Sequence, residues 1–319
     1  MHYTLILAPP NATVPKSGPN GLIGDRVHQA PSFFSIYAKH RPILIWPDDV
    51  ATRSLFSFPG VEFLSGNTAA EMLPALKEKM FSEVFCFYSP TASIPPEREA
   101  DCHLLREADA IVSSLPGFKV SQPSRLNPLG SEPIWKQLFG TFSGQHELPR
   151  LPWFLPKEES IIWAAGMSAE EFPGAQEPNP LVILSPFSGS PKKAVEDAWW
   201  RELVSLLSDF PVVTAVYGQS ELEKAQLLFA GTNVSVIEAD LDQTIALGSL
   251  SNSIVIGIDG GRLNLLAASR KDPVYAFYGI WPASAWALPN VTVLEPGSNP
   301  SEVIRKIPQL NQILNSSYP

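Results

Sequence analysis

Residues 252–280 constrain the fold of this chain more than any other stretch. They contain an apolar run at 253–258, an Asp-Gly-Gly turn at 259–261, a short helical segment and a second apolar run at 274–278. Apolar runs of this length without polar alternation are typical of parallel strands buried on both faces. The pattern therefore predicts that Asp259 and a helix N-terminus lie at the carboxyl edge of a parallel sheet, where open α/β folds bind ligands.

The two glycines of the turn have two possible meanings. Gly260 and Gly261 let a ligand approach the backbone closely, and the N–H groups that open the following helix suit a phosphate. The same glycines also fit a crossover turn in which they only satisfy backbone geometry. These residues alone leave both interpretations open.

Composition excludes several classes of protein. The 319 residues are 45% hydrophobic and 17% charged, which is ordinary for a soluble globular protein of about two domains. The net charge of −9 argues against a nucleic-acid partner and against docking on anionic lipid, because both need clustered Lys and Arg. Cys86 and Cys102 have neither metal-type spacing nor the density of a disulfide framework, so a cytoplasmic protein is expected.

The ends of the chain give no sign of membrane insertion. No window holds the roughly 18 consecutive apolar residues of a spanning helix. The N-terminal MHYTLILAPP lacks a basic leader, and we interpret it as a first strand rather than a signal peptide.

Strand and helix patterns alternate along the chain, which predicts parallel, doubly wound sheets. Besides the two apolar runs above, strands are expected at 3–8, 43–46, 61–64, 83–88, 110–113, 181–184, 212–217, 234–237 and 291–294. Helices are expected at 26–39 (with a start as late as Pro31), 69–80, 97–107, 132–139, 195–208, 221–230, 242–250 and from Pro300 onward. Residues 147–159 carry three prolines and predict a linker. We therefore expect two α/β domains, 1–155 and 156–319.

Three blocks resemble glycosyltransferase family 9, the heptosyltransferases of lipopolysaccharide core synthesis. GIDGGRLNLLAASRKDPVYAFYG is similar to the family pattern Asp-Ser/Thr-Gly-x-x-His-Leu-x-Ala-Ala, which is followed by Pro-Val and a strand ending in Gly. GDRVHQAPSFFSIYAK is similar to its N-terminal Gly-Asp segment with a later proline. SPFSGSPKKAVEDAWWRELVSLL is similar to the block that opens its nucleotide-binding lobe. The three blocks occur in the family's order and span nearly the whole chain.

The resemblance implies the GT-B architecture, in which two Rossmann-like lobes with parallel sheets face a central cleft. The N-terminal lobe would bind the acceptor and the C-terminal lobe the nucleotide sugar. The implied reaction transfers a heptose-like sugar from a nucleotide diphosphate, typically ADP-linked, with inversion and with neither metal nor cofactor. The implied acceptor is a bacterial glycan or lipid-linked precursor at the cytoplasmic face of the inner membrane, with at most peripheral membrane contact.

By resemblance, Asp25 matches the carboxylate that deprotonates the acceptor hydroxyl, a step that inverting displacement requires. The alternative is that Asp25 only caps the helix that follows. Glu221 matches the acid that holds the ribose hydroxyls, and its alternative is a first-turn acid favoured by the helix dipole. Asp259, Gly260 and Gly261 would lie at the diphosphate.

The same resemblance assigns Lys193 to the family's phosphate-binding lysine, with Lys192 as an adjacent substitute. Ser188 would add a hydroxyl contact just before them. The alternative is that both lysines are solvated loop residues.

Two departures from the family pattern affect the donor site. Gly260 stands where the family has Ser or Thr, and Asn264 stands where it has His, so a hydroxyl donor and a titratable group are lost. These departures motivate the alternative of a diverged member that acts as a binding or assembly subunit. Another GT-B enzyme, such as a nucleotide-sugar epimerase, is a third hypothesis.

The pair Asp240 and Asp242 fits the metal-binding DxD motif of other glycosyltransferases. It lies at an expected helix start, where Asp commonly caps, so we interpret it as a cap. The five histidines show no ligand spacing. No metal site is therefore predicted.

Overall fold

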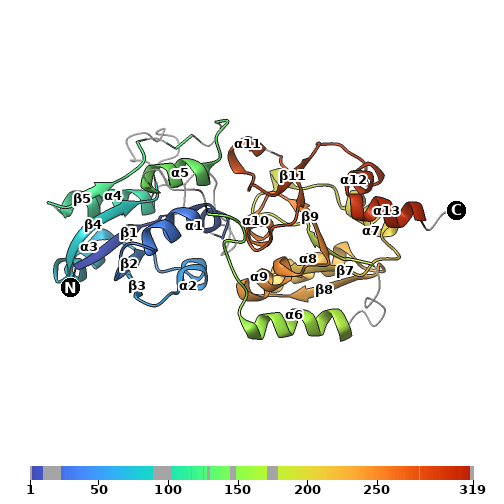
Figure 1. The fold of residues 1–319 in the computed structure, drawn as a ribbon, viewed down its shortest axis with the longest axis horizontal. Helices are drawn as coiled ribbons and strands as arrows, with labels where there is room; N and C mark the ends of the chain where they lie inside the picture. Colours follow the sequence, from blue (N-terminus) through green and yellow to red (C-terminus); the bar gives the residue numbers. More distant parts are fainter. Residues whose placement is uncertain are drawn as a thin grey trace. The chain divides into compact units, whose positions relative to one another are not determined.

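The computed structural model describes residues 2–9, 23–88, 103–115, 117–124, 126–127, 130–143, 149–170, 179–279 and 281–316. The chain forms two compact units, drawn as a ribbon in Figure 1. Unit 1 comprises Met1–Arg150 with Ser284–Trp286, and unit 2 comprises Leu151–Ala283 with Ala287–Pro319. The first division therefore falls inside the proline-rich segment. The acceptor and donor roles of the two units stay predictions.

Unit 1 is built on a five-stranded sheet in the order β3-β2-β1-β4-β5. Every described pairing in it is parallel. The strands are β1 (His2–Leu7), β2 (Ile43–Trp46), β3 (Val61–Phe63), β4 (Met80–Cys86) and β5 (Lys119–Ser121). Strand β2 is buried throughout and β1 is buried from Thr4 onward, as expected for central strands with helices on both faces.

The helices of unit 1 differ from expectation at three places, the first being α2, which the sequence did not indicate. The helices are α1 (Ile23–Tyr37), α2 (Val50–Phe56), α3 (Ala69–Lys77), α4 (His103–Ser114) and α5 (Ile134–Ser143). The α1 helix passes through Pro31 instead of starting there, because Ile23 and Val27 before the proline are buried along with Phe33 and Ile36 after it. Residues 110–113, expected as a strand, are the last turn of α4, and the edge strand is β5 instead.

Unit 2 carries a six-stranded sheet in the order β11-β10-β9-β6-β7-β8, again with parallel pairings. The strands are β6 (Leu181–Ser185), β7 (Val212–Val216), β8 (Val234–Glu238), β9 (Ser253–Ile258), β10 (Val274–Phe277) and β11 (Val291–Leu294). The chain moves outward from β6 to β8 and then returns to the other side of β6 as β9. The order therefore reverses between β6 and β9, and such a switch point is where open α/β sheets bind ligands.

The helices of unit 2 include two that the sequence did not indicate, α6 and α11. The elements are α6 (Glu158–Glu170), the 3-10 turn η4 (Pro191–Lys193), α7 (Asp197–Leu206), α8 (Gln219–Leu228), α9 (Leu241–Ser249), α10 (Gly261–Ala268), α11 (Ala283–Trp286), α12 (Pro300–Lys306) and α13 (Pro308–Ser316). Helix α7 packs on α12, whereas α9 packs on both α6 and α10.

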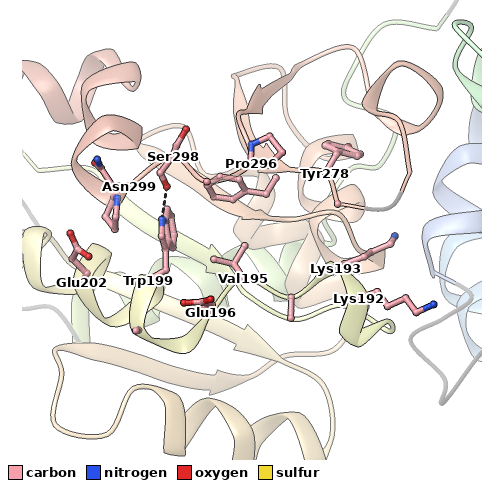
Figure 2. Close-up of a pocket in the computed structure, with 16 residues that line it drawn as sticks. Lys192, Lys193, Val195, Glu196, Trp199, Glu202, Tyr278, Pro296, Ser298 and Asn299 are labelled. Carbon is pink, nitrogen blue, oxygen red and sulfur yellow. Dashed lines mark hydrogen bonds between the residues drawn. The ribbon is translucent and has the colours of Figure 1, made fainter.

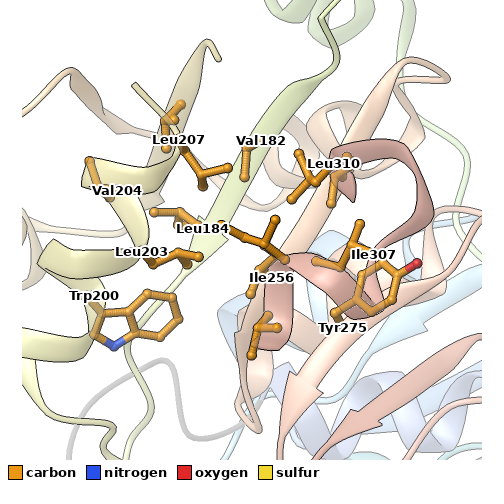
Figure 3. Close-up of a cluster of buried hydrophobic side chains, with 14 of the residues drawn as sticks. Val182, Leu184, Trp200, Leu203, Val204, Leu207, Ile256, Tyr275, Ile307 and Leu310 are labelled. Atoms are coloured by element: carbon orange, nitrogen blue, oxygen red, sulfur yellow. The ribbon is translucent and has the colours of Figure 1, made fainter. Parts of the chain in front are cut away.

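A continuous apolar core joins β6, β9 and β10 of unit 2 to the inner faces of α7, α12 and α13. Figure 3 shows Trp200 and Leu203 of α7 on one side of this cluster and Ile307 and Leu310 on the other. All four side chains are at most 1% exposed. The core therefore fixes β6 and β9 side by side and holds α7 at a constant distance from them.

In the part of the chain that the structure describes, no helix has the length and apolar character needed to cross a membrane.

Candidate functional site

The carboxyl edge of the second sheet brings together the residues that follow β6 and β9. Asp259 comes directly after β9, and its backbone N–H donates to the carbonyl of Phe277 on β10 at 2.9 Å. The turn η4 follows β6, which is the strand paired with β9. Both segments leave the sheet at its switch point because β6 and β9 are adjacent and parallel.

Lys193 and Asp259 form an ion pair at this edge. The Nζ of Lys193 lies 2.5 Å from the Oδ2 of Asp259, and the two side chains are 14% and 5% exposed. Two residues that the sequence analysis assigned separately to phosphate binding therefore lie together. Lys192 is exposed beside them and has no ion pair among the described residues.

The loop after β6 lies directly against the glycine turn. A Cβ on Gly260 would lie 3.1 Å from the carbonyl oxygen of Phe187 and 3.3 Å from the Cβ of Ser188. A larger residue at this position would displace the loop, which gives the glycine a packing reason. The hydroxyl of Ser188 bonds within its own loop, donating to the carbonyl of Ser190 at 3.0 Å and accepting from its N–H at 3.1 Å.

Helix α10 begins without a side-chain cap. Gly260 is its N-cap residue and Gly261 its first residue, and among the described residues the first N–H groups have no side-chain capping bond. Uncapped N–H groups together with the helix dipole favour an anion at this point. One turn later Asn264 is 3% exposed, and its Oδ1 has no hydrogen-bond partner among the described residues.

Glu221 and Arg262 form a second charged pair at the same edge. Glu221, in the first turn of α8, accepts a hydrogen bond from the N–H of Tyr217 at 3.0 Å, and its Oε2 lies 3.6 Å from Nη2 of Arg262. Nη1 of Arg262 donates to Oγ1 of Thr244 on α9 at 3.0 Å. Burial lowers the pKa of Arg262 and the nearby carboxylate of Glu221 raises it, so the guanidinium stays charged at neutral pH. Arg262 was not predicted as a site residue, although a single charged residue in an otherwise apolar helix is a usable signal.

A pocket of about 540 Å³ opens beside the Lys193–Asp259 pair. Figure 2 shows that it extends from Lys192 and Lys193 past Tyr278 to Trp199, between the η4–α7 segment and the loops that follow β10 and β11. Its volume lies within the roughly 300–1,000 Å³ that is usual for small-molecule sites.

Asp25 lies in unit 1, in the first turn of α1, and is 9% exposed. Its neighbour Arg26 is fully buried and holds this turn to the end of β1. The guanidinium donates to the carbonyl of Ala8, to Oε1 of Gln29 at 2.8 Å and to Oδ2 of Asp49 at 2.6 Å. The helix turn that carries Asp25 is therefore anchored to two acceptors outside α1, the carbonyl of Ala8 and the carboxylate of Asp49. Its role as a base stays a prediction.

The interpretation of Asp240 as a cap is confirmed. Its side chain accepts from the N–H of Gln243, and the side chain of Gln243 accepts from the N–H of Asp240, which is a capping box at the start of α9. Asp242 pairs instead with Lys157 at 2.5 Å. Within the described ranges no group of His, Cys, Asp and Glu has a metal-binding arrangement.

No protein-family model matches the sequence of this chain, and no curated protein sequence matches it. Its similarity to known proteins is structural. Two α/β units with parallel sheets, the second with a ligand-type switch point, define the GT-B class.

Particular solved structures in that class match the whole chain. The family 9 glycosyltransferase from Veillonella parvula DSM 2008 gives a TM-score of 0.67 at 13% identity, covering 98% of this chain and 97% of that one. The E. coli heptosyltransferase WaaC with ADP gives 0.62 at 15% identity, covering 97% of this chain and 99% of that one. WaaC with ADP-2-deoxy-2-fluoro heptose gives 0.56 at 13% identity and covers 99% of both. The chain therefore has the fold of the family 9 heptosyltransferases.

Proposed function

We propose that this protein is a glycosyltransferase that transfers a sugar from a nucleotide diphosphate donor. The Lys193–Asp259 ion pair carries the proposal, because it lies at the switch point of the sheet beside the uncapped N-terminus of α10. A cation and free backbone N–H groups at one point are what a diphosphate requires. The full-length likeness to family 9 structures supports the same reading.

The proposed donor is ADP-linked and carries a heptose-like sugar, in line with the ADP and ADP-sugar bound to WaaC. Glu221 would accept from the ribose hydroxyls, with Arg262 fixing its carboxylate. Ser188 and Lys192 would add contacts beside the diphosphate. No cofactor enters this proposal.

The proposed reaction is a single inverting displacement without a metal. The acceptor hydroxyl oxygen attacks the anomeric carbon, and the bond from that carbon to the β-phosphate oxygen breaks with its electron pair. The nucleoside diphosphate leaves with one more negative charge, which Lys193 and the α10 N–H groups would stabilise. The proton of the acceptor hydroxyl would pass to the carboxylate of Asp25. The proposed acceptor is a glycan or lipid-linked precursor at the cytoplasmic face of the inner membrane.

Thermal shifts with ADP, UDP, GDP and dTDP test the donor site. A nucleotide at 100 times its dissociation constant adds about 2.7 kcal/mol, which raises the melting temperature by about 5–10 °C. We expect ADP to stabilise the wild type and Lys224→Ala, an exposed position on α8. We expect Lys193→Ala to lose most of the shift. The absence of any nucleotide shift in the wild type would refute the proposal.

Two other functions remain as alternatives because Gly260 and Asn264 supply neither the hydroxyl nor the imidazole of the family pattern. A binding or assembly subunit would bind the nucleotide and catalyse no turnover. An epimerase of the hydrolysing type would use water in place of an acceptor and release the epimerised free sugar and the nucleoside diphosphate. Incubating the protein with the stabilising nucleotide sugar, with and without glycan acceptors, separates the three by the product formed.

A further inference from the structure

The pocket beside α7 carries opposite charges at its two ends (Figure 2). Lys192 lies at one end, exposed and without an ion pair in the part of the chain that the structure describes. Glu196 and Glu202 lie at the other end, and both are exposed. Because no described neighbour neutralises these three side chains, the pocket suits a ligand that carries one charge of each sign.

Glu196 and Glu202 flank Trp199 on one stripe of α7. The three residues follow one another at intervals of three, so each carboxylate lies about one helical turn from the indole. Glu196 is the N-cap residue of α7 but makes no capping bond, and neither glutamate has a side-chain partner among the described residues. Two uncompensated carboxylates attract a cation to the space beside the indole.

The Trp199 ring is held in an orientation that suits such a cation. It lies 5.0 Å from the rings of both Trp200 and Phe277 in nearly perpendicular contacts. Its Nε1 donates to the carbonyl of Ser298 at 2.8 Å, so the indole N–H is already bonded and the ring offers a ligand its π face. Trp is the best aromatic partner for an ammonium group.

Tyr278 supplies an unused donor at the lysine end of the pocket. A Cβ on Gly279 would lie 3.4 Å from the Cα of Lys193 and 3.5 Å from the carbonyl oxygen of Lys192, so the segment after β10 lies against the two lysines. Tyr278 lines the pocket and is 6% exposed, and its hydroxyl has no hydrogen-bond partner among the described residues. Burial and the charge of Asp259 both raise its pKa, so the phenol stays protonated and can donate. A buried donor without a partner is costly unless a ligand supplies the acceptor.

We propose that this pocket binds a zwitterion, namely an aminoalkyl phosphate. Its ammonium group would lie on the Trp199 ring between Glu196 and Glu202. Its phosphate would accept from Tyr278 and pair with Lys192. This ligand is neither a nucleotide nor a neutral sugar, so the site goes beyond the proposed function and is tested separately from it.

Isothermal titration calorimetry of the full chain tests the zwitterion site with three probes. Aminopentyl phosphate carries both charges, pentyl phosphate lacks the ammonium group and aminopentanol lacks the phosphate. Glu196→Gln combined with Glu202→Gln removes the carboxylates without adding bulk. Asp197→Asn is the matched control, because Asp197 is exposed on the same helix and outside the pocket lining. Tyr278→Phe removes only the buried hydroxyl.

We expect the wild type and Asp197→Asn to bind aminopentyl phosphate about tenfold more tightly than pentyl phosphate. Aminopentanol should bind the wild type at least about tenfold more weakly than aminopentyl phosphate. In the double Gln variant the preference for the ammonium group should fall to about twofold. Tyr278→Phe should weaken the binding of both phosphates by about fivefold and leave their ratio unchanged.

A wild-type ratio near one would overturn the zwitterion site. A ratio that survives in the double Gln variant, or that falls equally in Asp197→Asn, would overturn it as well. ADP is titrated in parallel, and the double Gln variant should bind it within about twofold of the wild type. Failure of ADP to bind the wild type would instead overturn the proposed function and leave the comparison of the phosphate probes intact.

Discussion

Asp259→Asn tests whether the Lys193–Asp259 pair is a buried structural contact as well as a ligand site. The substitution keeps the side-chain volume but removes the charge that balances Lys193. Because the two groups are only 14% and 5% exposed, the ammonium is left with little water to replace its partner. Leaving one charge of a buried pair uncompensated costs about 3–5 kcal/mol. The amide oxygen that remains can still accept a hydrogen bond from Lys193, which is itself partly exposed. We therefore expect a loss of unfolding free energy at the lower end of this range, about 3 kcal/mol.

The assay is thermal unfolding of the ligand-free protein at neutral pH, followed by tryptophan fluorescence. For a unit of this size, about 3 kcal/mol lowers the melting temperature by about 6–12 °C. Lys193→Met should destabilise by a similar amount, because it strands the carboxylate. The double variant should lose less than the sum of the single losses by at least about 2 kcal/mol, since neither charge is then left alone. Losses that add within about 0.5 kcal/mol would refute the reasoning.

Two further predictions concern unit 1. Arg26→Met should lower the free energy of unfolding by about 3 kcal/mol in urea, because Asp49 loses its buried cation. Arg26→Lys should restore only part of that stability, since one ammonium cannot reach the three acceptors of the guanidinium. Full restoration of stability by Lys would contradict this reasoning. Burial raises the pKa of Cys86 to about 12, above its ordinary value of 9.0, so at pH 8 roughly one native thiol in ten thousand is ionised. In a Cys102→Ser background, iodoacetamide at pH 8 should therefore label Cys86 only after urea unfolding, and rapid labelling of the native protein would show that the thiol is accessible.

The buried strands were predictable because their chemistry is local. Residues 43–46 and 253–258 form strands with the expected bounds, since short apolar runs between turns have few other ways to be buried. Residues 110–113 misled for the same reason. Their run of Ala, Ile and Val resembles a strand, but Leu105, Ala108 and Ile111 are buried at helical spacing and place the segment in α4.

Helix α6 was missed because it lacks an amphipathic pattern. Its residues Ile161 and Ile162 are 46% and 66% exposed, so the apolar positions do not trace a single buried face. A helix is predicted from apolar residues that recur with a 3.6-residue period, and α6 does not have this pattern.

Individual residues of the candidate site could be predicted from the sequence, but the ion pairs between them could not. Lys193 and Asp259 were named as separate phosphate contacts, and their ion pair depends on β6 and β9 being neighbours, which the sequence does not state. The ion pair between Glu221 and Arg262 likewise joins α8 to α10, two helices that connect different pairs of strands. Tyr278 gave no signal at all, because only its buried hydroxyl distinguishes it from a core aromatic residue.

The assignment of Ser284–Trp286 to unit 1 has a consequence for synthesis. Within that unit, the hydroxyl of Ser284 donates to the carbonyl of Gly130 at 3.2 Å and Trp286 contacts the ring of His28 edge-on at 5.3 Å. These residues leave the ribosome roughly 130 residues after the rest of unit 1, a delay of about 7 to 27 seconds at ordinary translation rates. The packing of unit 1 around His28 therefore stays incomplete during synthesis until Trp286, in the second half of the chain, has been made.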